Sequence, residues 1–95
     1  MYEAVTRLRS AGIVAAQRRT TLTYAEAAMA IDELYPARAL GRALDLLSHD
    51  CIQRREPSLA ALVVRSDSGE VGEGWAASTA NPAKERERCY ERWRK

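Results

Sequence analysis

The side chains with the greatest potential for chemistry are two cysteines, Cys51 and Cys89, and a single histidine, His49. A nucleophilic thiol needs a base beside it, but His49 and Cys51 stand two positions apart in an expected helix. Side chains with that spacing point about 200° apart around the helix axis and cannot pair. The cysteines also lack a C-x-x-C spacing and companion histidines, so the sequence indicates neither a disulfide framework nor a zinc site.

Other candidates for catalysis are equally sparse. Asp32 and Glu33 are adjacent, so their carboxylates diverge and fit a helix end better than an acid–base pair. Gly69, Gly72 and Gly74 resemble a phosphate loop in composition, but no Lys-Ser or Lys-Thr pair follows them. We therefore expect no enzymatic activity, no metal ion and no cofactor, and use of a cysteine in some other way is the alternative.

Charge is distributed unevenly along the chain. The 95 residues include 29% charged residues and have a net charge of +2. Residues 1–20 carry four arginines against one glutamate, and residues 84–95 carry six Lys or Arg against three Glu, so each end has a charge of +3. The segment 21–83 between them has a charge of −4. Cationic ends attract polyanions, so the pattern favours an anionic partner, although the small net charge weakens that inference.

Length and composition indicate a single domain with one core. The hydrophobic content of 46% in 95 residues provides one modest core and no interdomain cleft. The N-terminus has no signal-peptide pattern, and no apolar run reaches the length of about 18 residues that spans a bilayer. We expect a cytoplasmic protein without membrane contact.

The most informative stretch is residues 23–47, which predicts a helix-turn-helix. Thr23-Tyr24-Ala25-Glu26 matches a capping box, in which the Thr hydroxyl and the Glu carboxylate each accept from an amide at the helix start. A helix should therefore begin near Tyr24 and end around residues 32–33. Pro36 then fits the first turn of a second helix, where a missing amide hydrogen is tolerated.

This second helix should extend from Pro36 to about Arg54. Its buried face is predicted from the helical spacing of Leu40, Leu44, Leu47 and Cys51, and Arg38, Arg42, Asp45 and His49 form the opposite, available face. Gly41 near its start costs about 1 kcal/mol relative to Ala. Two explanations are open: close packing on the preceding helix, or close approach of a partner.

The remaining chain completes a mainly α-helical fold with a small β-hairpin. A first helix is expected over residues 2–16, and residues 17–22 form a connector or a very short strand. A hydrophobic strand at 59–65, a polar turn and a Gly-rich strand at 70–75 predict a hairpin, which after a helix-turn-helix forms a wing. The fold class is thus a winged helix-turn-helix in residues 1–80.

Residues 81–95 are expected to add a C-terminal helix of mixed charge. Asn81-Pro82 is a typical helix start, and the following residues alternate in charge. Cys89, Tyr90 and Trp93 supply a narrow apolar stripe. We expect this helix to be exposed and weakly docked through its two aromatic residues.

Several of these motifs, in this order, resemble a known family. T-Y-A-E-x-A, A-R-A-L-G-R-A-L, a proline, V-V-R-S-D and S-G-E-V-G are similar to the C-terminal DNA-binding domain of alkylguanine-DNA alkyltransferases and the non-catalytic alkyltransferase-like proteins. The resemblance covers roughly residues 2–75, and A-R-A-L-G is its most specific fragment.

The resemblance implies roles for matching positions. Arg38 would enter the base stack from the minor groove and hold open the space of a flipped nucleotide, and Tyr24 would press on the neighbouring phosphate. Ala37, Ala39 and Gly41 would be the small residues that let the helix seat closely in the minor groove.

The match fails at the catalytic motif. Where the family has P-C-H-R, this chain has Pro57-Ser58-Leu59-Ala60, so both the acceptor thiol and its activating histidine are missing. Alkyl transfer is not expected. The similarity is also compatible with a shared winged-helix scaffold alone, because fold does not determine function.

The sequence therefore favours a non-enzymatic winged-helix protein that binds double-stranded DNA through the start of its third helix. The expected contacts are Thr23, Tyr24, Ala37, Arg38, Gly41, Arg42 and Arg65. The alternative is a protein-interaction module, either a homodimer or a small regulator, of bacterial or phage origin. The acidic predicted hairpin and the aromatic residues of the last helix favour this alternative, since Trp, Tyr and Arg are frequent interface anchors.

Overall fold

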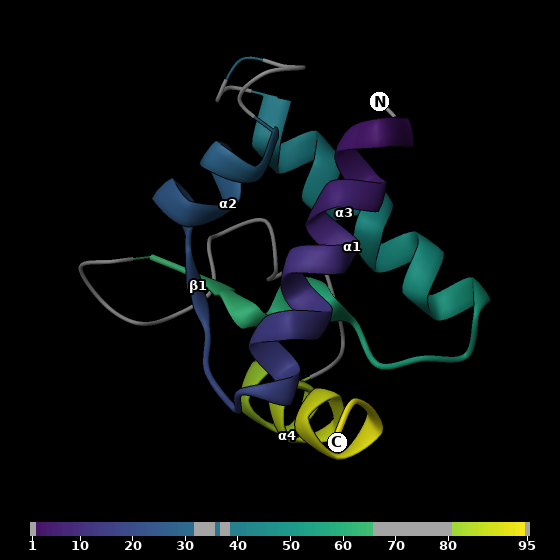
Figure 1. Cartoon of the computed structure of the whole chain (residues 1–95). Helices are drawn as coiled ribbons and strands as arrows, with labels where there is room; N and C mark the ends of the chain where they lie inside the picture. The colour runs from purple at the N-terminus through teal and green to yellow at the C-terminus, as the bar shows by residue number, and fades with distance from the viewer. Residues whose placement is uncertain (1, 32–35, 37–38, 66–80, 95) are drawn as a thin grey trace.

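The computed structural model describes residues 2–31, 36, 39–65 and 81–94. These residues form a mainly helical fold with a two-stranded parallel sheet (Figure 1). In chain order the elements are α1 (Tyr2–Gln17), β1 (Leu22–Thr23), α2 (Tyr24–Ile31), α3 (Leu40–Gln53), the 3-10 helix η2 (Leu59–Leu62), β2 (Val63–Val64) and α4 (Pro82–Arg92). None of the described helices is long and apolar enough to cross a membrane.

Helix α1 confirms the predicted first helix and explains its glycine. Ala4, Leu8, Ala15 and Ala16 are buried along one side of α1, where it packs against α2, α3 and η2. Gly12 faces η2, and a Cβ added to it would lie 3.2 Å from Leu59 Cβ. The missing side chain therefore lets η2 approach α1 closely, which compensates for the low helix propensity of glycine.

The sheet differs from the predicted hairpin. Residues 59–62 form the 3-10 helix η2 and not a strand, and β2 is limited to Val63 and Val64. The strand pairs in parallel with β1, with Leu22 opposite Val63 and Thr23 opposite Val64. The reason is chemical: Leu and Ala lack the β-branching that favours extended backbone, and the helical turn buries all four of their side chains.

The rest of the predicted wing lies outside the described residues. Its expected turn at 66–69 and second strand at 70–75 both fall in the segment 66–80. The short strand that was considered between helices one and two is present as β1. Its partner is β2, and the paired residues are 41 positions apart in sequence, which the local pattern did not reveal.

Helix α3 has the predicted faces and end but a later start. Leu40, Leu47 and Cys51 are buried and Leu44 is half-buried. The opposite side exposes Arg42, Asp45 and His49.

The start of α3 was predicted at Pro36 but is found at Leu40. The carbonyl of Pro36 accepts a hydrogen bond from the Ala39 amide at 2.9 Å, an i to i+3 bond that closes a tight turn ahead of the α-helix.

Helix α4 begins where predicted but is embedded more deeply than expected. The Asn81 side chain caps its first amides, accepting from Ala83 N at 2.9 Å, and Pro82 occupies the first turn. Cys89 is fully buried and Tyr90 is 8% exposed. The Cys89 thiol donates to the carbonyl of Ser58 at 3.3 Å, so the helix is part of the core and not a weakly docked appendage.

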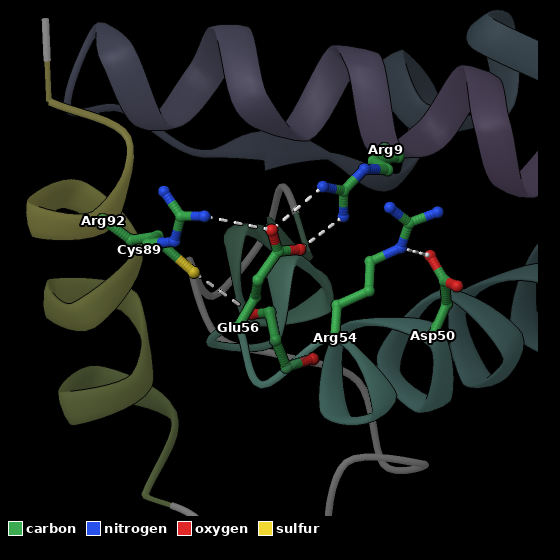
Figure 2. A network of polar contacts seen from close by, with 7 residues as sticks. Arg9, Asp50, Arg54, Glu56, Cys89 and Arg92 are labelled. Carbon is green, nitrogen blue, oxygen red and sulfur yellow. Dashed lines mark hydrogen bonds and ion pairs between the residues drawn. The ribbon is translucent and has the colours of Figure 1, made fainter.

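Glu56, which follows the end of α3, forms ion pairs with an arginine of α1 and an arginine of α4. Arg9 on α1 donates from both of its terminal nitrogens to the Glu56 carboxylate, at 2.7 and 3.2 Å, and Arg92 on α4 donates to it at 3.3 Å (Figure 2). The guanidinium carbons of Arg9 and Arg92 lie 5.3 and 4.6 Å from the ring centre of Trp93. The hydrogen bonds from Arg9 hold the pKa of Glu56 below its usual value.

Shortly after the ends of α1 and α3, an arginine adopts the left-handed backbone conformation that glycine usually occupies. Arg19 after α1 has φ 53° and Arg55 after α3 has φ 58°. Around each one the chain makes the two backward hydrogen bonds of a Schellman motif, for example Glu56 N to Cys51 O at 2.9 Å. Arg19 is held further by Tyr90, whose ring centre lies 5.1 Å from the guanidinium.

Candidate nucleic-acid interface

The first part of the candidate interface is the start of α2. The predicted capping box is present: Glu26 N donates to Thr23 Oγ1 at 3.1 Å, and Thr23 N donates to Glu26 Oε1 at 2.9 Å. These two bonds fix the direction in which the chain leaves β1. Tyr24, the first residue of α2, is half-buried and packs against the core cluster, so part of its surface is available to a partner.

Strand pairing brings Arg65 to the same place. Because Thr23 lies opposite Val64 in a parallel pair, the next residues, Tyr24 and Arg65, leave the sheet at the same end. Arg65 is exposed. The structure thus gathers Thr23, Tyr24 and Arg65, three of the predicted contact residues, at one edge of the two-stranded sheet.

The second part is the first turn of α3. Leu40 is 7% exposed and anchors this turn in the core, while Gly41 and Arg42 are exposed. Arg42 makes no ion pair within the described part of the chain, in contrast to Arg54, which is paired with Asp50 at 3.1 Å. A free guanidinium on the outer face of the turn is a suitable donor to an external anion.

Gly41 packs against none of the described residues outside its own helix. A Cβ built on Gly41 would meet no described atom within 4 Å. The explanation that Gly41 allows close packing on α2 is therefore wrong for the described neighbours, and the approach of a partner is the explanation that stays open. Gly12, where an added Cβ would lie 3.2 Å from Leu59 Cβ, shows the opposite case in the same fold.

The two groups of residues lie at different ends of α2. The start of α2 follows β1, and its end leads toward α3 (Figure 1). An eight-residue helix rises about 1.5 Å per residue, or roughly 12 Å in all. Ala37 and Arg38 lie outside the described residues, so their predicted contacts are not placed.

The thiols and the histidine lie apart from this surface. Burial raises the pKa of the Cys51 thiol, and burial, with Glu85 nearby, raises that of Cys89 to about 12. His49 is exposed, and its Nε2 lies 3.1 Å from Gln53 Nε2. No group of three or more metal-binding side chains occurs among the residues that the structure describes.

Sequence reasoning missed the Glu56 cluster and the parallel sheet. Glu56 stands between Arg55 and Pro57 with no helical or strand pattern, and its partners are 47 and 36 positions away. The pairing of β1 with β2 had a faint local signal in the β-branched residues Thr23, Val63 and Val64. Comparison with known proteins adds nothing to these assignments, since no protein family, curated protein or solved structure matches this chain.

Proposed function

We propose that this chain is a non-enzymatic nucleic-acid-binding protein of the winged-helix type, which contacts duplex DNA through the N-terminal part of α3. The proposal rests mainly on Gly41, which is exposed and has no described atom near the position of its missing side chain. Glycine in a helix costs about 1 kcal/mol relative to alanine, and no described neighbour needs the missing side chain. A glycine at this position would let a sugar-phosphate backbone approach the helix closely, which would explain why it is present.

Exposed arginines, one in the first turn of α3 and two elsewhere on the chain, support the same partner. Arg42 follows Gly41 and has no ion pair within residues 39–65 or elsewhere in the described chain. Arg18 and Arg65 are also exposed. Arginines that meet phosphates supply the sequence-independent part of DNA affinity and fix the register of the protein on the duplex.

The resemblance to alkyltransferase-like proteins supplies the preferred docking mode. In that mode α3 lies in the minor groove, Arg38 fills the space of a flipped nucleotide, and Tyr24 presses on the adjacent phosphate. The half-buried position of Tyr24 beside Arg65 is compatible with this role. Because Cys and His are missing from the P-C-H-R position, binding would occur without alkyl transfer.

Titration of a labelled duplex with the full chain tests the proposal, at about 50 and 200 mM salt. Three phosphate contacts would reduce the affinity of the wild type roughly 40-fold between these conditions. Arg42→Ala should weaken binding and lower the salt slope by about one contact. Arg38→Ala should weaken binding, and weaken it more on a duplex with an unpaired base.

Arg88→Ala serves as the control, because Arg88 is an exposed arginine on α4, paired with Glu85 at 3.4 Å. Its removal should leave DNA affinity unchanged. Absence of duplex binding at about 50 µM protein, a concentration that reaches even weak non-specific binding, would contradict the proposal. So would equal losses for Arg42→Ala and Arg88→Ala.

The alternative function is protein interaction, and exposed apolar side chains favour it. Tyr2, Met29 and Ile52 have relative exposures of 81%, 75% and 64%. Large apolar side chains on a surface are frequent at protein interfaces, although scattered ones need no explanation. A homodimer at micromolar concentration, measured by sedimentation and lost on Met29→Ser or Ile52→Ser, would support this function in place of DNA binding.

A further inference from the structure

A groove lies between α1 and α3. Its volume is about 220 Å³, and both helices line it, with Tyr2, Val5 and Arg9 on one side and Leu46, Asp50 and Arg54 on the other. In Figure 1 α1 crosses in front of α3, and the two helices are in contact. The groove does not include Gly41, which stands five positions before Leu46 and so points about 140° away around α3.

The size of the groove restricts its occupant. Small-molecule sites usually have volumes of about 300–1,000 Å³, so a cofactor is too large for this groove. One bulky side chain of a peptide fits better. Tyr2, Val5 and Leu46 provide apolar walls, and Tyr2 is 81% exposed, so its ring is available to cover an inserted side chain.

The charge at the groove restricts the occupant further. Arg54 uses only its Nε to bond Asp50, at 3.1 Å, and its terminal nitrogens point away from that carboxylate toward α1 (Figure 2). This exposed pair within one helix is weak. Arg55 follows, exposed and without an ion pair in the described part of the chain. Two arginines, Arg9 and Arg54, line the groove against one acidic residue, Asp50, so an incoming carboxylate is favoured over a cation.

We infer that the α1–α3 groove is a docking site for an acidic segment of a partner protein. One bulky apolar side chain of the segment lies between Tyr2, Val5 and Leu46. A neighbouring carboxylate of the segment accepts from the free terminal nitrogens of Arg54. This site is independent of the proposed DNA surface, so the protein would connect a nucleic acid on one side of α3 with a protein on another.

An NMR titration of the full chain tests the inference. The probe is a short Gly-Ser peptide with one Phe flanked by Glu residues, and the matched peptides replace Phe by Ser or Glu by Lys. The acidic Phe peptide should shift the amide signals of Val5, Thr6 and Leu46. Arg54→Glu should weaken binding about tenfold, because it reverses the charge that meets the carboxylate. Asp50→Asn should tighten binding, since a neutral amide competes less than a carboxylate for Arg54.

Two further variants distinguish binding in the groove from nonspecific binding to exposed apolar side chains. Tyr2→Ala should weaken peptide binding with little effect on the melting temperature, because Tyr2 is exposed. Ile52→Ala removes another exposed apolar side chain, on α3, that does not line the groove, and it should leave peptide binding unchanged.

Absence of shifts at about 1 mM peptide, a concentration that detects even weak binding, would overturn the inference. Equal binding of the Ser peptide or the Lys peptide would do the same. DNA binding that fails while the peptide binds would overturn the proposed function and leave the groove assignment intact.

Discussion

Two helical glycines, Gly12 and Gly41, have different surroundings in this fold. Gly12 is buried, and its missing side chain makes room for Leu59. Gly41 is exposed and makes room for nothing in the described chain. Both lie in helices, where glycine is unfavourable, but only the first has a structural compensation among the described residues. The central claim about function depends on this difference.

Glu56 is the residue whose loss should cost the most stability among the charged groups. Glu56→Gln weakens the bonds from Arg9 and Arg92, whose charges then lie without a counter-ion beside Trp93. We expect the free energy of unfolding to fall by about 2 kcal/mol, since hydrogen bonds between charged groups are the stronger ones. Chemical denaturation at neutral pH measures this loss.

The matched control is Glu91→Gln, which removes an exposed i, i+3 pair with Arg94. Such surface pairs contribute about 0–1 kcal/mol. Equal effects of the two substitutions would contradict the role given to Glu56.

The same carboxylate gives stability a pH dependence. Bonding to Arg9 lowers the pKa of Glu56 in the folded state, so the folded state favours the charged form. Its contribution is fully present above the unfolded pKa of about 4.3 and is lost as the pH falls through the lower, folded pKa. Wild type should therefore lose part of its advantage over Glu56→Gln as the pH falls below about 4.

At the scale of elements, α4 is the part whose role the structure changes most. Its narrow stripe of Cys89, Tyr90 and Trp93 suggested weak docking, but Cys89 is fully buried against Ser58. We expect a chain truncated after residue 80 to lose cooperative unfolding, because the truncation exposes the apolar residues under α4. Thermal denaturation of the truncated chain measures this.

Thiol reactivity provides a second readout. In the intact chain both cysteines are buried and should react slowly with an aromatic disulfide reagent. Truncation should make Cys51 reactive at the rate of an unfolded control. Cooperative melting and a protected Cys51 in the truncated chain would show that α4 is dispensable, contrary to its place in the core.

The elements that sequence reasoning predicted correctly are those determined by local chemistry. The capping box at Thr23, the asparagine cap of α4 and the buried face of α3 follow from residues three to eleven positions apart, and the structure confirms each one. The start of α3 and the strand at 59–62 were wrong. In both places a tight i to i+3 turn competes with the regular element, and tertiary burial decides between them.

The contacts between distant segments were beyond the sequence pattern. Parallel pairing of β1 with β2 needs the whole intervening α2–α3 unit as a crossover, and two-residue strands have no readable period. The candidate site likewise combines residues identified from local motifs with a position set by a contact between distant segments. Thr23, Tyr24, Gly41 and Arg42 were identified from motifs, whereas the position of Arg65 beside Tyr24 follows only from the sheet.

The whole molecule has a small net charge of +2, and α3 presents three different surfaces on its different sides. The first turn of α3 presents Gly41 and Arg42, the α1 side presents the apolar groove, and the inner side holds the core. A net charge this small gives little long-range attraction to DNA. Affinity would therefore have to come from local fit, and the bare turn at Gly41 is where that fit is most sensitive.

Gly41→Ala is the measurement that tests the central claim most directly, with stability and duplex affinity determined on the same sample. The free energy of unfolding should rise by up to about 1 kcal/mol, because alanine is the better helix former and its Cβ meets no described neighbour. Duplex affinity should fall about tenfold, the loss that corresponds to about 1.4 kcal/mol, because the methyl group separates α3 from the DNA backbone. A more stable protein with unchanged duplex affinity would contradict the claim that α3 meets DNA at this turn.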